Sequence, residues 1–563
     1  MTLALLVACG DANPAPDIPP PHTLSLACPG DPRCPDADGV LQVGAAVADI
    51  LPSCWERWDD EAGDATWSRD DPFHDCGCDH VCVADGAGVP DKGEGDGVFD
   101  AIWLAGFGHA RAATGVRGAD RGLVGEGDGL QVRALALERG STAVGIVVFD
   151  AVGVMYDDVE RLRADVEAAG LPYDHVIVHS SHVHASPDTM GIWGPSIVTT
   201  GYDAETLQEM RAAAVAVLDT AWQQRTEATL RIGTVDATDY ADNGVANLVV
   251  DTRDPVIVDP RVGVATFESP EGAPIATLVH FANHPETVAS GNTLVTSDYV
   301  HALRRTVEVG SVWESGGRAG VGGVALFLNG TVGGMMTSLG AEVHTPDGDV
   351  WAAASFEKAD AVGQLLGEMA LDAIDAAEPV DTDLALGVQE LFLRVDNYAF
   401  QAMFLLGVLA HREAENYDPE QTITVENTPE IRTEVDLLRV GPLTLLTWPG
   451  EPLPETFVGG YDGRWTPPGS DLVSPDNPLP PDLAAAPSGP SVEDGLPGST
   501  RWVVGLGNDA VGYMIPPYDF VVADAGAYIL EPEGDHYEET NSLGVDTLPR
   551  ILEATETLNA WAR

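Results

Sequence analysis

The 563-residue chain has very little positive charge. Lysine occurs only at Lys92 and Lys358, and 28 basic residues face 89 acidic ones, which leaves a formal net charge of −61. A surface this anionic repels phosphate backbones, so we expect no nucleic-acid partner. A large acid excess with scarce lysine is the composition expected of a protein that works in high salt, where screening weakens self-repulsion.

Long hydrophobic runs are also missing. No apolar segment reaches the roughly 18 to 20 residues that a membrane-spanning helix needs, so the sequence predicts no such helix. Hydrophobic residues at 44% and charged residues at 21% are typical of a globular protein and exclude wholesale disorder. The length predicts one large domain or two to three ordinary ones.

Cysteine is absent from the chain after Cys82. Apart from Cys9, the cysteines lie between Cys28 and Cys82, at Cys28, Cys34, Cys54, Cys76, Cys78 and Cys82. An even number in one region of an exported chain predicts three disulfides. The alternative is a metal cluster of Cys76, Cys78 and Cys82 with His74 or His80, and the export signal described next favours the disulfides.

The N-terminus is a short apolar run that ends in Leu6-Val7-Ala8-Cys9. This ending resembles the bacterial lipobox, in which the cysteine is lipidated and becomes the mature N-terminus. The run is shorter than the usual apolar region of about 7 to 15 residues and carries no Lys or Arg. We predict a truncated lipoprotein signal over residues 1–9, a Pro-rich tether over 10–38, and an exported protein that is membrane-anchored or extracellular. The alternative is a frayed apolar N-terminus.

Apolar runs alternate with helical periods from about Leu41 onward. We predict strands over residues 143–154, 174–182, 274–282, 324–328 and 443–448, and helices over 157–169, 204–224, 299–309 and 357–377. This order predicts an α/β fold with a mixed β-sheet core, flanking helices and chemistry on loops at the strand ends. The Pro/Gly-rich stretch 463–500 predicts a long surface loop. The acidic segment Asp91–Asp100 is either a solvated loop or a Ca²⁺ site, although its spacing fits an EF-hand poorly.

Four of the fourteen histidines fall within ten residues, at His175, His179, His182 and His184. His182 and His184 end a strand-like run, and because strand side chains alternate, both imidazoles would face one side. His284 and Glu451 follow two other predicted strands. Each residue has an ordinary alternative: a polar strand edge, a hydrogen-bonded loop histidine, or a turn acid that aids solubility.

Taken together, these segments resemble the neutral/alkaline (non-lysosomal) ceramidases. The similar segments, in order, are Val43–Ile50, Arg133–Leu135, Ser181–Pro187, Phe281–Pro285 with Ser297-Asp298, Leu446–Glu451, Gly505–Tyr513 and Tyr537–Ser542. The resemblance implies a zinc ion held by His182, His284, Glu451 and Tyr513, with His184 as the catalytic residue that faces the substrate. It covers residues 41 to 563, so we expect one catalytic domain over 39–563 without the family's C-terminal immunoglobulin-like domain.

One segment departs from the family. The family carries Gly-Asp-x-Ser-Pro, whose serine lies near the scissile amide, whereas this chain has Gly334 at the aspartate position and Met336 at the serine position. Thr337 and Ser338 are the nearby hydroxyls that could replace that serine. Arg253 is the candidate for the family's basic substrate contact.

The donor set that the resemblance implies also makes chemical sense. Two imidazoles, a carboxylate and a phenol oxygen suit Zn²⁺, and zinc lowers the pKa of a bound water to about 7, which supplies hydroxide to attack a carbonyl. The sequence therefore predicts a zinc-dependent amidohydrolase of neutral ceramidase type that cleaves an N-acyl sphingoid or related N-acyl lipid. Two alternatives stay open: a zinc hydrolase of the same fold acting on a different amide or ester, which Met336 favours, and a non-catalytic surface-anchored binding protein.

Overall fold

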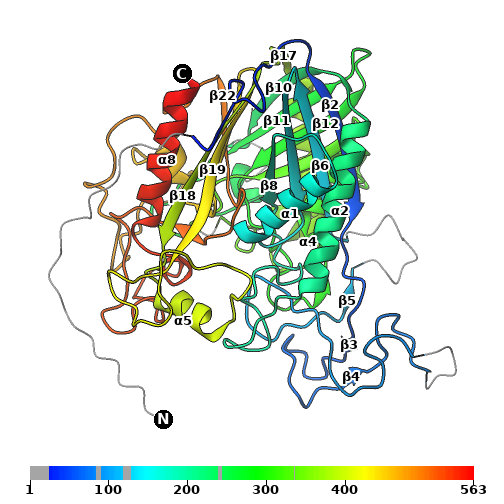
Figure 1. Cartoon of the computed structure of the whole chain (residues 1–563), viewed down its shortest axis with the longest axis vertical. Helices are drawn as coiled ribbons and strands as arrows, with labels where there is room; N and C mark the ends of the chain where they lie inside the picture. The colour runs from blue at the N-terminus through cyan, green and yellow to red at the C-terminus, as the bar shows by residue number, and fades with distance from the viewer. Residues whose placement is uncertain (1–23, 84–89, 118–128, 239–243, 335, 535) are drawn as a thin grey trace.

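The computed structural model describes residues 24–563 except 84–89, 118–128, 239–243, 335 and 535. Its core contains three five-stranded sheets (Figure 1). The first sheet has the order β8 (His175–Ser180), β7 (Thr142–Phe149), β6 (Gln131–Arg139), β2 (Gln42–Asp49) and β9 (Thr226–Glu227). The second has the order β14 (Val324–Asn329), β12 (Pro274–Phe281), β11 (Arg261–Glu268), β10 (Thr229–Asp236) and β17 (Glu378–Val380). The third has the order β1 (Leu26–Cys28), β18 (Leu384–Arg394), β19 (Glu430–Val440), β20 (Leu443–Thr447) and β22 (Thr500–Val504).

The three sheets share one local pattern. In each, an antiparallel hairpin is followed by a crossover to a strand that pairs in parallel with the second hairpin strand: β6–β7 then β8, β11–β12 then β14, and β19–β20 then β22. The crossovers of the first two sheets contain α1 (Tyr156–Ala168) and α3 (Tyr299–Glu308). The third contains the short helices α6 (Pro454–Val458) and α7 (Val492–Gly495), joined by a long, mostly exposed loop. Parallel pairing requires such crossovers and places both strand ends at the same edge.

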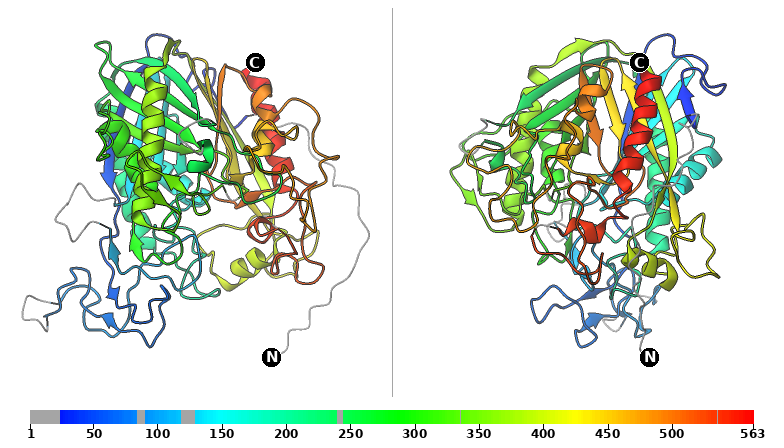
Figure 2. Two further views of the ribbon diagram at one scale, coloured as in Figure 1. Left: turned by 180° about the vertical axis from the view of Figure 1, so that it is seen from behind. Right: turned by 90° about the vertical axis from the view of Figure 1, so that its left-hand side faces the viewer.

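Helices cover the outer faces of the sheets. The helix α2 (Ala204–Gln223) packs on β2 and β6, α4 (Phe356–Asp375) packs on β10, β11 and α3, and α8 (Thr547–Ala562) packs on β18 and β19. In the left view of Figure 2, α8 lies on the opposite side of the molecule from the green helices. None of the helices in the described part of the chain is both long enough and apolar enough to cross a membrane.

Local signals explain why these helices form where they do. Asp203 caps α2 by accepting hydrogen bonds from the backbone N–H groups of Glu205 and Thr206, and Ser355 caps α4 by accepting one from Lys358. The buried face of α2 recurs every three or four residues, at Leu207, Met210, Ala214, Val217, Leu218 and Ala221. The predicted helices agree with α1, α2, α3 and α4 to within about two residues at each end. The α/β class with mixed sheets and flanking helices is confirmed.

The inner faces of the three sheets meet in a shared apolar core. It contains Leu135 and Ile146 of the first sheet, Phe267 and Leu278 of the second, and Leu438 of the third, all buried. Because each sheet buries its inner face against the other two, their strand ends are held in one fixed relationship.

The N-terminal region differs from the predicted tether. Residues 26–28 form β1, which pairs antiparallel with β18 so that Leu26 lies opposite Val388. Leu26 and Cys28 are buried in the shared core, and this burial explains why the segment joins the sheet edge despite the neighbouring prolines. The predicted signal over residues 1–9 lies outside the described residues.

The cysteines form the three predicted disulfides. The pairs are Cys28–Cys34, Cys54–Cys78 and Cys76–Cys82. The prediction is confirmed, and the alternative metal cluster is wrong because its cysteines are bonded to one another or to Cys54. In the neighbouring acidic loop, Asp91 accepts a hydrogen bond from the backbone N–H of Asp79 at 2.9 Å. The Ca²⁺ alternative for that loop stays a prediction.

Candidate metal centre

The candidate ligands lie where the three parallel strand pairs end. His182 and His184 follow β8, and His284 follows β12. Glu451 and Tyr513 open the short strands β21 (Glu451–Pro452) and β23 (Tyr513–Met514), which follow β20 and β22. Loops at the carboxyl ends of parallel strands commonly hold binding sites, and here each sheet contributes to one cluster.

The His-Val-His segment is not part of a strand. β8 ends at Ser180, and His182 has a φ of 69°, in the left-handed region that non-glycine residues seldom adopt. The strand predicted over 174–182 therefore ends two residues early, and a turn, not strand alternation, brings the two imidazoles together. The backbone N–H of His182 donates to the carbonyl of Ala151 at 2.9 Å, which holds this turn, and the ring centroids of His182 and His184 lie 4.7 Å apart.

Backbone carbonyls orient two of the imidazoles. Nδ1–H of His182 donates to the carbonyl oxygen of Val152 at 2.6 Å, and Nδ1–H of His284 donates to that of Met336 at 2.9 Å. A carbonyl can only accept, so each neutral ring keeps its proton on Nδ1 and presents the lone pair of Nε2. Val152 follows β7 and Met336 follows β14. In both sheets, one strand of the parallel pair leads to the histidine and the other to the carbonyl that orients it.

The two free lone pairs meet a carboxylate. Nε2 of His182 and Nε2 of His284 lie 3.4 Å and 3.2 Å from Oε2 of Glu451. Ligand atoms bonded to a tetrahedral Zn²⁺ at about 2.0 to 2.2 Å lie about 3.3 to 3.6 Å from one another. The spacing and the chemistry of these donors therefore fit zinc.

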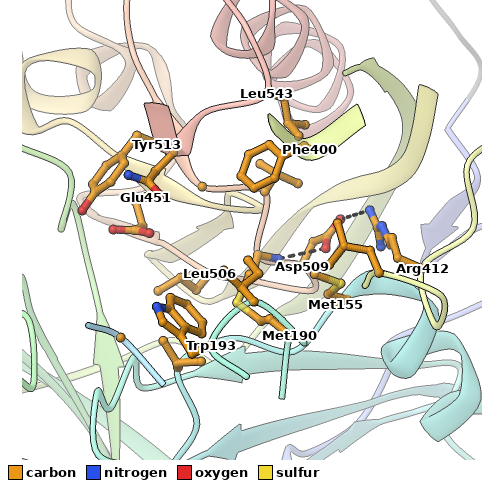
Figure 3. A pocket seen from close by; sticks show the side chains of 18 of the residues that line it. Met155, Met190, Trp193, Phe400, Arg412, Glu451, Leu506, Asp509, Tyr513 and Leu543 are labelled. Carbon is orange, nitrogen blue, oxygen red and sulfur yellow. Dashed lines mark hydrogen bonds and ion pairs between the residues drawn. The ribbon is translucent and has the colours of Figure 1, made fainter. Parts of the chain in front are cut away.

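Glu451 and Tyr513 are brought together by strand pairing. They are direct partners in the parallel pair β21–β23, and Glu451 donates its backbone N–H to the carbonyl of Gly512 at 2.9 Å. Figure 3 shows the phenol and the carboxylate beside each other at one side of a pocket. Burial and the Glu451 carboxylate raise the pKa of Tyr513 well above its usual value, so the phenol is neutral. Its role as a fourth ligand stays a prediction.

No family model matches the sequence, and no curated protein matches it. The crystal structure of a neutral ceramidase from Pseudomonas aeruginosa matches with a TM-score of 0.56 at 13% identity, covering 93% of this chain and 75% of that one. A ceramidase described as complexed with C2 matches with a TM-score of 0.57 at 12% identity, covering 93% and 76%.

The chain has a neutral ceramidase-like fold. The resemblance drawn from short motifs is therefore confirmed at the level of the fold. At 12 to 13% identity this structural similarity supports the fold alone, and the fold does not determine the chemistry of the site.

A third histidine stands in a different environment from the other two. Nδ1 of His184 lies 3.3 Å from a carboxylate oxygen of Glu286, without a hydrogen bond between them. Burial lowers the pKa of His184 to about 4, so its imidazole is neutral at pH 7. Although burial acts in the opposite direction, His184 lowers the pKa of Glu286 to about 2. Among the described residues, Nε2 of His184 has no hydrogen-bond partner.

In this neutral ceramidase-like fold, His184 could also belong to a second set of possible metal ligands. One nitrogen each of His182, His184 and His284 lie within 4.8 Å of one another, close enough to hold a metal ion without Glu451. Glu286 was missed by sequence reasoning. The available signal was its position two residues after His284.

Arg253 does not line the pocket beside the candidate ligands. Its side chain is 2% exposed and makes ion pairs with Asp519 at 3.1 Å, with Glu539 at 3.3 Å and with Glu538. The prediction that Arg253 contacts substrate is not supported by this placement, because the guanidinium is surrounded by three carboxylates.

The pocket lining also lacks three residues of the segment that matches the family's serine motif, Met336, Thr337 and Ser338. The side chain of Met336 is buried in the core that the first two sheets share with the helices. Oγ1 of Thr337 accepts a hydrogen bond from the backbone N–H of Leu339 at 3.0 Å, and the hydroxyl of Ser338 lies 2.7 Å from that of Thr287. Neither hydroxyl lines the pocket, and a role for either in place of the family serine stays a prediction.

The pocket itself is largely apolar (Figure 3). His182, His184, Glu451 and Tyr513 line it together with apolar side chains that include Met155, Met190, Trp193, Phe400, Leu506 and Leu543. The cavity measures about 100 Å³. A cluster of metal-ligand atoms therefore stands at the side of a space suited to an apolar group.

Proposed function

We propose that this protein is a zinc-dependent amidohydrolase that cleaves the amide bond of an N-acyl lipid. The observation that carries the proposal is the approach of two imidazole Nε2 atoms to one carboxylate oxygen of Glu451, at 3.4 and 3.2 Å, beside an apolar pocket. The neutral ceramidase-like fold supports it, because the matched structures are named as ceramidases.

The residues have separate tasks in this proposal. His182, His284 and Glu451 hold the metal, with Tyr513 beside them, and the carbonyls of Val152 and Met336 keep both Nε2 lone pairs directed inward. A bound Zn²⁺ would supply Lewis acidity, which polarises the substrate carbonyl and makes a water molecule acidic enough to attack it near neutral pH. The phenols of Tyr513 and Tyr537 line the pocket and offer O–H donors to the substrate oxygen.

His184 is the proton carrier in this proposal. Its Nε2 has no partner among the described residues and its ring is neutral, so it can accept a proton from the attacking water. The same nitrogen then delivers that proton to the departing amine. Glu286 faces Nδ1 and stabilises the imidazolium that exists between the two transfers.

The second candidate function is hydrolysis of a different amide or an ester on the same fold. Met336 favours it, because the family's serine position carries a thioether that is buried away from the pocket. A thioether cannot donate a strong hydrogen bond to the developing oxyanion. The third candidate, a non-catalytic binding protein, keeps the same metal ligands without turnover.

The proposed location is outside the cytoplasm. Three disulfides form and persist in oxidising compartments, which supports export. Attachment to a membrane surface through a lipidated Cys9 is part of the proposal and rests on the sequence of the first nine residues.

Metal analysis followed by a hydrolysis screen tests the proposed function. We expect about one zinc per chain, and chelator-sensitive release of amine from N-acyl lipids that returns when zinc is added back. Chelator-sensitive ester cleavage with intact amides would favour the second candidate. Stoichiometric zinc without hydrolysis of any substrate would favour a binding protein, and the absence of zinc affinity would refute the metal centre.

A further inference from the structure

The pocket beside the candidate ligands ends on a buried ion pair. Nη2 of Arg412 donates to Oδ2 of Asp509 at 2.7 Å, and these side chains are 3% and 1% exposed. Figure 3 shows this pair on the opposite side of the pocket from Glu451 and Tyr513, with apolar side chains between. A chain that extends from the candidate ligands across the pocket therefore meets this charged pair on the opposite side.

The ion pair is held firmly on both sides. Oδ1 of Asp509 accepts hydrogen bonds from the backbone N–H groups of Tyr156 at 3.0 Å and Ala510 at 2.9 Å. Arg412 also donates to Asp157 at 3.0 Å and to the carbonyl of Arg432 at 3.0 Å. Moving Arg412 aside would leave the Asp509 carboxylate buried without this cation, and moving Asp509 aside would break its hydrogen bonds to two backbone N–H groups, so both movements are unfavourable. The pocket cannot lengthen easily in this direction.

The size of the cavity also limits the length of the chain that it can hold. It measures about 100 Å³. An apolar cavity of about 150 Å³ in another protein holds one benzene molecule, and pockets for drug-sized ligands measure about 300 to 1,000 Å³. The enclosed part of this space suits a chain of a few carbons, so a long fatty acyl chain would have to extend beyond it.

We propose that the apolar pocket selects short acyl groups of about four to eight carbons, and that Arg412 and Asp509 set this limit. The inference rests on the proposed function, because it names the acyl part of the same substrate. In the reaction, water adds its oxygen to the acyl carbon, the carbon–nitrogen bond breaks, and the protons of water pass to the amine and the buffer. The products are a short-chain carboxylate and a free amine.

A homologous substrate series tests the limit. One amine is acylated with chains of 2, 4, 6, 8, 12 and 16 carbons, and kcat/KM is measured on the zinc-loaded wild-type protein. We expect a rise of about fourfold per methylene, as for burial of one CH₂ group, up to the limit, and at least a tenfold lower value at 16 carbons. A maximum at 16 carbons would overturn the inference and leave the proposed hydrolysis standing.

Binding of the product acids tests the chain-length limit even if the protein does not hydrolyse the substrates. If the zinc-loaded protein hydrolyses none of the substrates, the proposed function fails, and calorimetry with hexanoate and hexadecanoate still tests the pocket. Tighter binding of hexanoate supports the limit. Tighter binding of hexadecanoate, or no binding of either acid, overturns it.

A charge-free variant tests the two residues directly. In Arg412→Met with Asp509→Leu, apolar side chains of similar volume replace the pair, and we expect the preferred chain to lengthen by at least two carbons. The matched control is Arg117→Met with Asp360→Leu, which removes a two-bond ion pair outside the pocket and should leave the chain-length profile unchanged.

A second variant covers the case in which the first does not fold, as judged by circular dichroism. Met190→Phe narrows the pocket near the ion pair, and we expect the preferred chain to shorten. An unchanged chain-length profile in the folded variants would overturn the assignment of Arg412 and Asp509.

Discussion

The carboxylate of Glu286 lies 3.3 Å from Nδ1 of His184, and both side chains are buried beside the candidate metal ligands. His182 and His284 instead face backbone carbonyls through Nδ1. The carbonyls fix the tautomers of His182 and His284 so that Nε2 of each faces the carboxylate of Glu451, whereas His184 faces a carboxylate through Nδ1. In the proposed function this difference makes His182 and His284 metal ligands and His184 the proton carrier.

Replacing Glu286 with Gln tests this division. We expect kcat to fall by about 10²- to 10⁴-fold, because the carboxylate no longer stabilises the imidazolium, while KM and the zinc content stay close to wild type. Steady-state kinetics measure kcat and KM, and metal analysis of the same preparation measures the zinc content. Glu286→Asp, which keeps the charge, should recover part of the rate. Loss of zinc in Glu286→Gln would show instead that His184 is a metal ligand.

Single histidine variants distinguish the two donor sets. His182→Ala and His284→Ala should each abolish stoichiometric zinc, because each removes one of the Nε2 atoms near Glu451. His184→Ala should keep the zinc and lose most activity. The exposed His74→Ala is the control for loss of a histidine elsewhere. Full zinc occupancy in a His182→Ala, His284→Ala double variant would refute the site, and loss of zinc in His184→Ala would favour the three-histidine set.

Introducing the family's serine at position 336 should not create a hydroxyl that reaches the substrate. The Met336 side chain lies in the core, so Met336→Ser should destabilise the fold by on the order of 2 to 5 kcal/mol without raising turnover of ceramide. Met336→Leu, with a similar volume, is the control. Thermal unfolding and kinetics on both variants test this. Faster ceramide hydrolysis by Met336→Ser would show that position 336 reaches the substrate.

The buried Glu455 predicts a loss of stability as pH rises. Burial raises the pKa of Glu455 from 4.5 to about 8, so the folded protein holds a proton that the unfolded chain releases at lower pH. The resulting stabilisation is complete below about pH 4.5 and is lost as pH rises to about 8. Glu455→Gln should match wild type near pH 5 and be more stable near pH 9, by on the order of 1 to 3 kcal/mol.

Thermal unfolding between pH 5 and 9 measures this difference. The exposed Glu426→Gln serves as the control and should follow the wild-type profile. If the stability curves of wild type and Glu455→Gln stay parallel across the range, the side chain is not held neutral by its surroundings.

The lipid anchor is tested at Cys9. If Cys9 is lipidated, the mature protein should partition into the detergent phase and Cys9→Ser should move it to the aqueous phase. A body with a net charge of −61 gains no attraction to anionic lipids, so the lipid would have to supply the binding. Wild-type protein found entirely in the aqueous phase would contradict the anchor.

The helices and the order of the candidate ligands were predictable from the sequence because their signals are local. A cap such as Asp203 and an apolar repeat such as that of α2 act within one or two turns of chain. The same holds for the motif order from His182 to Tyr513. In contrast, β1 could not be predicted, because Leu26 enters the core only by pairing with Val388, more than three hundred residues away.

The sequence by itself determined the α/β class, the cysteine pairing region and the types of donor atom available for a metal. Only the tertiary structure decided how those donors are used. The left-handed turn at His182, the carbonyl of Met336 on His284, the burial of Arg253 among carboxylates and the approach of Glu286 to His184 all depend on how three separate sheets pack. The reason is physical: these contacts join strand ends far apart in the chain, and their geometry exists only when the shared core holds the sheets together.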